Sequence, residues 1–150
     1  MIAAASICEV TASSRSRSFT HAADKVLCHI VNLVNAINRH DYAIAWAMAC
    51  DLGRAVVHAE SVALQISSCS ERHRAMLRLD SLRPVAMHAL ACAPRPSPLA
   101  IAQARSTERG LDRSAWASEE QAWRAARAAF GSLCIVVTHG DNLILRSLST

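Results

Sequence analysis

The sequence predicts a mainly α-helical domain with a short β element at its C-terminal end. Apolar residues recur at helical spacing through much of the first hundred residues, and only four glycines interrupt the chain. β-Branched residues instead gather in one short run, Leu133–Thr138, near the C-terminus. At 150 residues, the chain has the length of one domain.

The apolar residues available for a core are small. Of the 78 hydrophobic residues, 29 are alanine and six are cysteine. A buried Leu, Ile or Phe stabilises a fold by roughly 1.5–3 kcal/mol and alanine by much less. We therefore expect marginal stability, or a partner or second copy of the chain that covers further apolar surface.

The N-terminal half predicts an arm followed by a helical hairpin. Residues 1–19 are expected to form a mobile arm, because 11–18 are polar and rich in serine. A first helix follows, with Thr20 as a possible cap, and runs to a break at Asn38–Asp41. A second begins with Asp41 as its N-cap and reaches Gly53, so that the two pack as a hairpin.

Residues 20–93 form the helical region as a whole. After Gly53, residues 54–67 are also expected to be helical. Ser70 then caps a short helix through Leu79, and Pro84 begins another through Leu90. Prolines alternate with other residues at 94–98, which predicts an extended, stiff link and the one internal boundary of the chain.

Residues 99–150 are expected to form helices followed by short strands. One helix covers Leu99–Arg109 and ends at Gly110. The next begins at Ser118, with Gln121 completing a capping box, and ends at Gly131. The run Leu133–Thr138 then predicts a strand covered on both faces, and Leu143–Leu148 is a last apolar run.

Residues 118–141 combine three features in order. They begin with an alanine- and arginine-rich helix, continue through Phe130–Leu133, and end with the apolar strand and turn Ile135–Asp141. This order resembles the late helix and strand of the α/β-hydrolase fold, which implies a parallel sheet and an acid of the catalytic triad near Gly140. The family's catalytic motifs are absent, because no Gly-x-Ser-x-Gly elbow occurs. The resemblance therefore implies a fragment or decayed relative without an identifiable nucleophile.

Positive charge comes from 15 arginines and one lysine, and residues 71–150 carry the whole net charge of +4. The guanidinium fork bonds phosphates and carboxylates in pairs, so the predicted partner is nucleic acid, bound non-specifically, or an acidic protein. The alternative is an ordinary solvated face. The candidate contacts are Arg72, Arg74, Arg78, Arg83, Arg105, Arg109, Arg124 and Arg127.

Two pairs have the spacing of metal ligands, Cys69-x3-His73 and His88-x3-Cys92. Residues four apart share a helix face, so two such helices packed antiparallel would close a tetrahedral zinc site. The alternative is that these side chains are ordinary thiols and imidazoles. No other cofactor is expected.

The N-terminal residues lack the pattern of a signal peptide, and no apolar stretch has the length of a membrane span. The six cysteines are then expected as reduced thiols in the cytoplasm.

No catalytic residue is identified. Asp41 is explained as a helix cap, and the acidic pair Glu119–Glu120 is explained by the positive end of the helix dipole. The sequence thus favours a small basic binding protein over an enzyme. A GC-rich reading frame without an evolved function has the same composition and stays an alternative.

Overall fold

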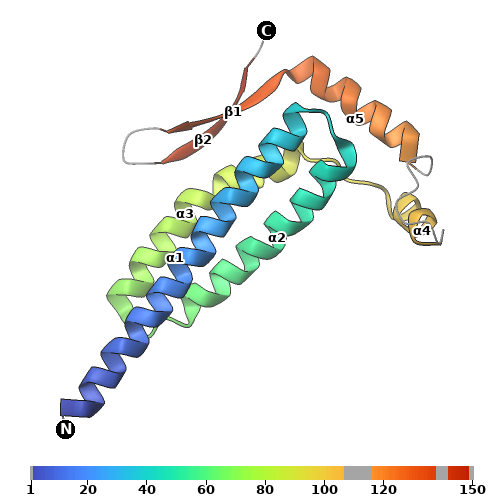
Figure 1. The fold of residues 1–150 in the computed structure, drawn as a ribbon. Coiled ribbons are helices and arrows are strands. Elements are labelled where there is room, and N and C mark those ends of the chain that lie inside the picture. Colours follow the sequence, from blue (N-terminus) through green and yellow to red (C-terminus); the bar gives the residue numbers. More distant parts are fainter. Residues whose placement is uncertain (1, 107–115, 138–141, 149–150) are drawn as a thin grey trace.

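The structure is a computed structural model that describes residues 2–106, 116–137 and 142–148, with side chains placed for 14–102, 116–137 and 142–148. It confirms the predicted class, because helices make up most of the described chain and the sheet found there has two short strands near the C-terminus. Figure 1 labels the elements, which are α1 (Ile2–Asn38), α2 (Tyr42–Leu64), α3 (Cys69–Cys92), α4 (Pro98–Ser106), α5 (Ala117–Phe130), β1 (Ser132–Val137) and β2 (Leu143–Leu148).

Helices α1, α2 and α3 lie side by side in an elongated bundle (Figure 1). The β-hairpin of β1 and β2 lies at one end of this bundle, together with α5. Each helix turns one stripe of apolar side chains inward. The stripe of α2 is mostly alanine, so the stability of the core depends on the larger side chains of α1 and α3. Core members include Val26, Ile30, Leu33, Ile37, Ala45, Leu52, Ala59, Ala63, Leu79, Leu82, Val85 and Ala89.

The first helix is longer than the sequence predicts. We expected it to begin near residue 20, but α1 is continuous from Ile2 to Asn38, and its first turns extend past the ends of α2 and α3 (Figure 1). Phe19 is buried, and the hydroxyl of Ser16 donates to the carboxylate of Glu71 on α3 at 2.9 Å. Packing against α3 therefore starts before residue 20, through contacts that the local composition does not reveal.

The predicted break after α1 is confirmed. His40 has a left-handed backbone with φ 56°, and its N–H donates to the carbonyl of Ile37, while the N–H of Asp41 donates to that of Ala36. These two bonds form a Schellman motif, which more often uses glycine. Asp41 then caps α2, because its carboxylate accepts from the N–H of Ile44 at 3.2 Å. The helical hairpin follows as predicted, and α2 continues through Gly53 to Leu64.

The third helix corrects two predictions. Its N-cap is Ser68 rather than Ser70, and the helix passes through Pro84 instead of restarting there. Pro84 is exposed, and the buried residues Leu82 and Val85 lie on either side of it. Burial of one continuous apolar stripe thus outweighs the hydrogen bond that proline removes.

Residues 94–97 lead out of the bundle without regular secondary structure, and α4 begins at Pro98. The hydroxyl of Ser97 accepts from the N–H of Ala100 at 3.2 Å. The predicted end of this helix at 109–110 lies outside the described residues. Helix α5 has Trp116 as its N-cap without a side-chain hydrogen bond, so the capping box predicted at Ser118 is wrong.

The two strands form an antiparallel hairpin in which Ile135 pairs with Leu145. Leu133 and Leu145 are buried against the bundle, while the ends of β1 are exposed. The expectation of a strand covered on both faces is therefore wrong. The parallel sheet implied by the hydrolase resemblance is not found among the described residues. The predicted helix end is confirmed, since Gly131 has φ 76° and its N–H donates to the carbonyl of Arg127.

Candidate functional site

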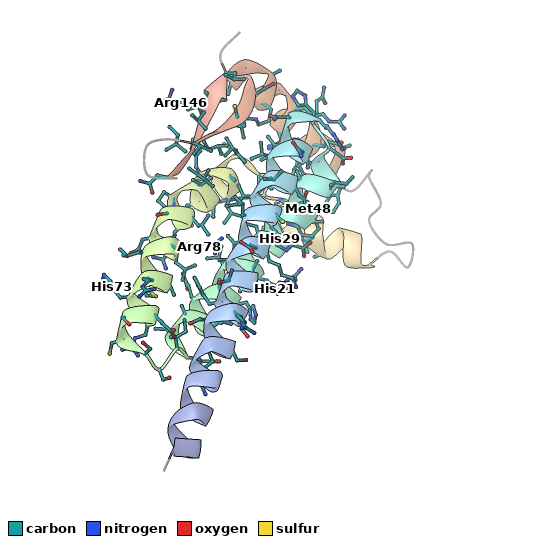
Figure 2. The ribbon with its side chains drawn as sticks, turned by 60° about the vertical axis from the view of Figure 1, so that its left-hand side comes forward. His21, His29, Met48, His73, Arg78 and Arg146 are labelled. Carbon is teal, nitrogen blue, oxygen red and sulfur yellow. The ribbon has the colours of Figure 1, made fainter. Side chains whose placement is uncertain are left out.

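The four predicted arginines of α3 lie on two sides of the helix. Arg74 and Arg78, four residues apart, face the α1 side, whereas Arg72 and Arg83 face the α2 side. Arg78 lies between α3 and α1 in Figure 2. A single helix face that follows a nucleic-acid backbone is therefore absent from α3.

Several of these arginines already have acidic partners within the chain. Arg78 forms an ion pair with Asp24 at 2.6 Å, and Arg83 forms one with Glu60 at 2.9 Å and another with Asp80. Arg78 and Arg83 thus join α3 to both other helices of the bundle. Each pair is substantially exposed and stabilises the fold by at most about 1 kcal/mol, but it neutralises the charge that a phosphate would meet.

The predicted arginines of α5 also differ from the expectation. Arg124 forms an ion pair with Glu120 at 2.6 Å, and its Nε donates to the carbonyl of His40 at 3.1 Å. Arg127 is 6% exposed and so lies below the surface that a nucleic acid would touch. The side chain of Arg105 and the whole of Arg109 lie outside the part that the structure describes.

Three arginines lie around the turn where α2 ends and α3 begins, Arg15 on α1 and Arg72 and Arg74 on α3. Arg15 of α1 donates to the carbonyl of Gln65 at 2.8 Å, and Arg72 donates to that of Ile66 at 3.5 Å. Arg74, two residues after Arg72, is exposed. Among the described residues, none of these three arginines forms an ion pair with an acid. We call Arg15, Arg72 and Arg74 the basic end of the bundle.

A shallow groove of about 250 Å³ adjoins the basic end, between α1 and α3. Its apolar lining includes Phe19 and Ile66, and its polar lining includes Ser16, Glu71 and Arg74. The sequence predicted Arg72 and Arg74 as candidate contacts but missed Arg15. The one signal for Arg15 was its charge, because the serine-rich segment around it was expected to be an arm.

The predicted zinc site does not form within one chain. All four ligands lie on α3, and a 24-residue helix is about 36 Å long, so the pair Cys69 and His73 lies at one end and the pair His88 and Cys92 at the other. His73 is exposed, on the outer side of α3 in Figure 2. The described residues contain no group of three side chains placed to hold a metal ion. The prediction failed because it required the helix to break near Pro84.

A polar network joins α2, α5 and the segment that leads to α4. The carboxylate of Glu119 accepts hydrogen bonds from the N–H of Ser97 at 3.0 Å and from the hydroxyl of Tyr42 at 3.3 Å. Bonds from Ser97 lower the pKa of Glu119, whereas burial, reinforced by the charge of Glu119, raises the pKa of Tyr42 to about 12. Glu119 therefore fixes the fold at this point, and a carboxylate held below its usual pKa is poorly suited to act as a general acid.

Aromatic side chains surround the same network. Trp116 is buried, and its ring meets those of Tyr42 and Trp46 edge to face, at centroid distances of 5.9 and 5.5 Å. Trp123 meets Tyr42 at 5.8 Å. Trp116 and Trp123 thus pack against other rings of the fold, which is a structural role rather than one in base stacking.

No helix in the described ranges is both long enough and apolar enough to cross a bilayer. Comparison of the chain with protein-family models, with curated proteins and with solved structures gave no match.

Proposed function

We propose that the protein is a binding module that holds nucleic acid non-specifically at the basic end of the bundle. The observation that carries this proposal is that Arg15, Arg72 and Arg74 lie around the α2–α3 turn and that, among the described residues, none of them forms an ion pair with an acid. Elsewhere, Arg78, Arg83 and Arg124 are neutralised by acids. Positive charge is therefore available to a ligand at this end of the molecule.

The chemistry of the basic end suits phosphates. Arg15 and Arg72 each use a hydrogen bond to a backbone carbonyl, which orients the guanidinium while other N–H donors stay available. The N-terminus of α3, capped by Ser68, adds partial positive charge nearby. The tryptophans contact other aromatic rings at the opposite end of α2, so binding would involve the phosphate backbone without base stacking.

We also place this activity in a reducing compartment such as the cytoplasm. The five cysteines in the described part of the chain are free thiols, and three of them are exposed. Exposed free thiols persist where glutathione and thioredoxin keep them reduced. The charge-based binding mode has no requirement for an oxidised cysteine framework.

Binding to a fluorescent 20-base-pair duplex of arbitrary sequence, followed by anisotropy, tests the proposal. Three phosphate contacts give a slope of about −2.7 in log affinity against log salt, so affinity should fall about 40-fold between 50 and 200 mM salt. Replacing Arg15, Arg72 and Arg74 together by glutamine should abolish most of the binding. Arg74→Gln alone, which breaks no hydrogen bond in the described structure, should reduce the slope by about 0.9.

The matched control replaces Arg39, Arg95 and Arg146 by glutamine, which removes the same charge from exposed positions elsewhere that form no ion pair among the described residues. This variant should keep the duplex affinity of the wild type to within about threefold. An equal loss in the control, or no retention of the duplex by the wild type at 50 mM salt, contradicts the proposal. Binding of polyglutamate rather than DNA would instead assign the basic end to an acidic protein.

A further inference from the structure

A second groove, of about 360 Å³, lies at the other end of the bundle between the last turns of α3, helix α5 and strand β2. Its lining is mainly apolar and includes Ala91, Ala126, Trp123 and Phe130. The indole N–H of Trp123 donates to the carbonyl of Cys92 at 3.1 Å, which fixes its ring in the groove wall. Phe130 is 66% exposed, so a large aromatic side chain borders the opening.

The same groove is lined by a buried charge. Arg127 is only 6% exposed and donates through Nη2 to the carbonyl of Gly131 at 2.9 Å. Its Nε is buried without a hydrogen-bond partner, and no described acid forms an ion pair with it. Arginine stays charged in proteins, and a buried charge without a counterion is strongly unfavourable. Among the described residues, none supplies a counterion to Arg127 or a hydrogen-bond partner to its Nε. An anion bound in the groove would supply the missing negative charge.

We propose that this groove binds a small organic carboxylate, with the carboxylate on Arg127 and the apolar body against Trp123 and Phe130. A volume of about 360 Å³ falls within the usual range for small-molecule sites. The guanidinium fork matches one carboxylate in a bidentate pair. A phosphate dianion would bring two charges to one cation within apolar walls and is therefore disfavoured. This site is separate from the basic end and does not depend on the proposal made for it.

Calorimetric titration of the whole chain with octanoate, octan-1-ol and acetate tests this assignment. Octanoate carries both the charge and the apolar body, whereas each of the other two carries one. Octanoate should bind at least tenfold more tightly than either. Equal affinity for octanoate and octan-1-ol, or no binding of octanoate, overturns the proposal without any substitution.

Two variants locate the site. Arg127→Met keeps the length of the side chain and removes the charge, so octanoate affinity should fall at least tenfold while octan-1-ol affinity stays within twofold. Ala126→Phe fills the groove with Arg127 intact and should abolish binding of both. The control Arg54→Met, an exposed position on α2, should leave octanoate binding unchanged. Unchanged octanoate affinity in both groove variants overturns the assignment, and circular dichroism checks that each variant is folded.

The carboxylate could belong to a free acid or to the C-terminus of another chain. An acetylated tetrapeptide that ends in leucine, compared with its C-terminal amide, separates these sources. Tighter binding of octanoate assigns the groove to free organic acids, and tighter binding of the peptide acid assigns it to a chain terminus. Where octanoate binds, equal binding of the peptide acid and its amide excludes a chain terminus and assigns the groove to free organic acids.

Discussion

The side-chain amide of Asn38 bonds both backbone groups of Leu133. Leu133 N–H donates to Oδ1 of Asn38 at 2.8 Å, and Nδ2 of Asn38 donates to the Leu133 carbonyl at 2.9 Å. The last residue of α1 thus forms the two hydrogen bonds that a neighbouring strand would form with β1. It fixes the hairpin over the end of the bundle and covers part of an otherwise open strand edge.

Asn38→Ala should therefore destabilise the protein by about 2 kcal/mol, because two partly buried backbone groups lose their partner. Guanidinium denaturation followed by circular dichroism measures the change. Asn35→Ala, an exposed position on the same helix, is the control and should shift the free energy of unfolding by less than about 0.5 kcal/mol. Equal effects of the two substitutions would show that the amide bonds contribute nothing.

The strands themselves were predictable, but their environment was not. The β-branched run before Thr138 has the composition of a strand, and β1 and β2 form where the two late apolar runs lie. That run suggested cover on both faces, as in a parallel sheet. The partner that closes the edge, Asn38, lies 95 residues earlier in the chain, and nothing in its local sequence indicates the contact.

The same limit applies to the candidate site. The spacing of arginines on α3 could be read from the sequence, and Arg72 and Arg74 were selected. Which guanidinium stays unpaired depends on distant acids, because Arg78 meets Asp24, 54 positions away. Arg15 was missed since the helix around it depends on tertiary packing rather than on local propensity.

The left-handed conformation of His40 predicts a stabilising substitution. A Cβ at φ 56° costs roughly 1–2 kcal/mol, and the added flexibility of glycine in the unfolded chain offsets about half of that. His40→Gly should therefore raise the free energy of unfolding by about 0.5–1 kcal/mol, measured by denaturant titration. His58→Gly, within regular helix on α2, should have the opposite sign, and destabilisation by both variants would contradict the strain at His40.

Pro84 predicts a second stabilising substitution. It lies inside α3, where proline leaves the carbonyl four residues earlier without its helical donor. Pro84→Ala should stabilise the protein by about 2 kcal/mol, somewhat less than the roughly 3 kcal/mol difference in helix propensity, because the unfolded chain becomes more flexible. The thermal midpoint measures the gain. Pro98→Ala at the first residue of α4, where proline is well tolerated, should give no such gain.

The hydrogen bonds of Glu119 make the stability of the fold depend on pH in the acidic range. Its hydrogen bonds from Ser97 lower its pKa in the folded state below the ordinary value of 4.5. A carboxyl group with a depressed folded pKa stabilises the fold above its unfolded pKa, and the contribution is lost as pH falls through the folded pKa. The difference in thermal midpoint between wild type and Glu119→Gln should be present at pH 6 and shrink below about pH 4.5. A difference that does not vary with pH would contradict this role.

The buried hydroxyl of Tyr42 makes the stability of the fold depend on pH in the alkaline range. Ionisation of this residue can also be measured directly by absorbance. Burial, followed by the charge of Glu119, raises its pKa from 10.0 to about 12. Because the folded pKa is raised, the contribution of Tyr42 is complete below pH 10 and is lost as pH rises from 10 towards 12. It is the only tyrosine in the chain, so phenolate absorbance near 295 nm follows this one residue.

The absorbance titration should have a midpoint near pH 12 in the folded protein, and one near the ordinary value of about 10 in guanidinium chloride. Glu119→Gln removes the nearby charge while the burial of Tyr42 remains, so the midpoint should fall only part of the way towards 10. Tyr42→Phe should flatten the decline of the thermal midpoint between pH 10 and 12. A native midpoint at 10 would contradict the burial of Tyr42 beside Trp116, and with it the docking of α5 on α2.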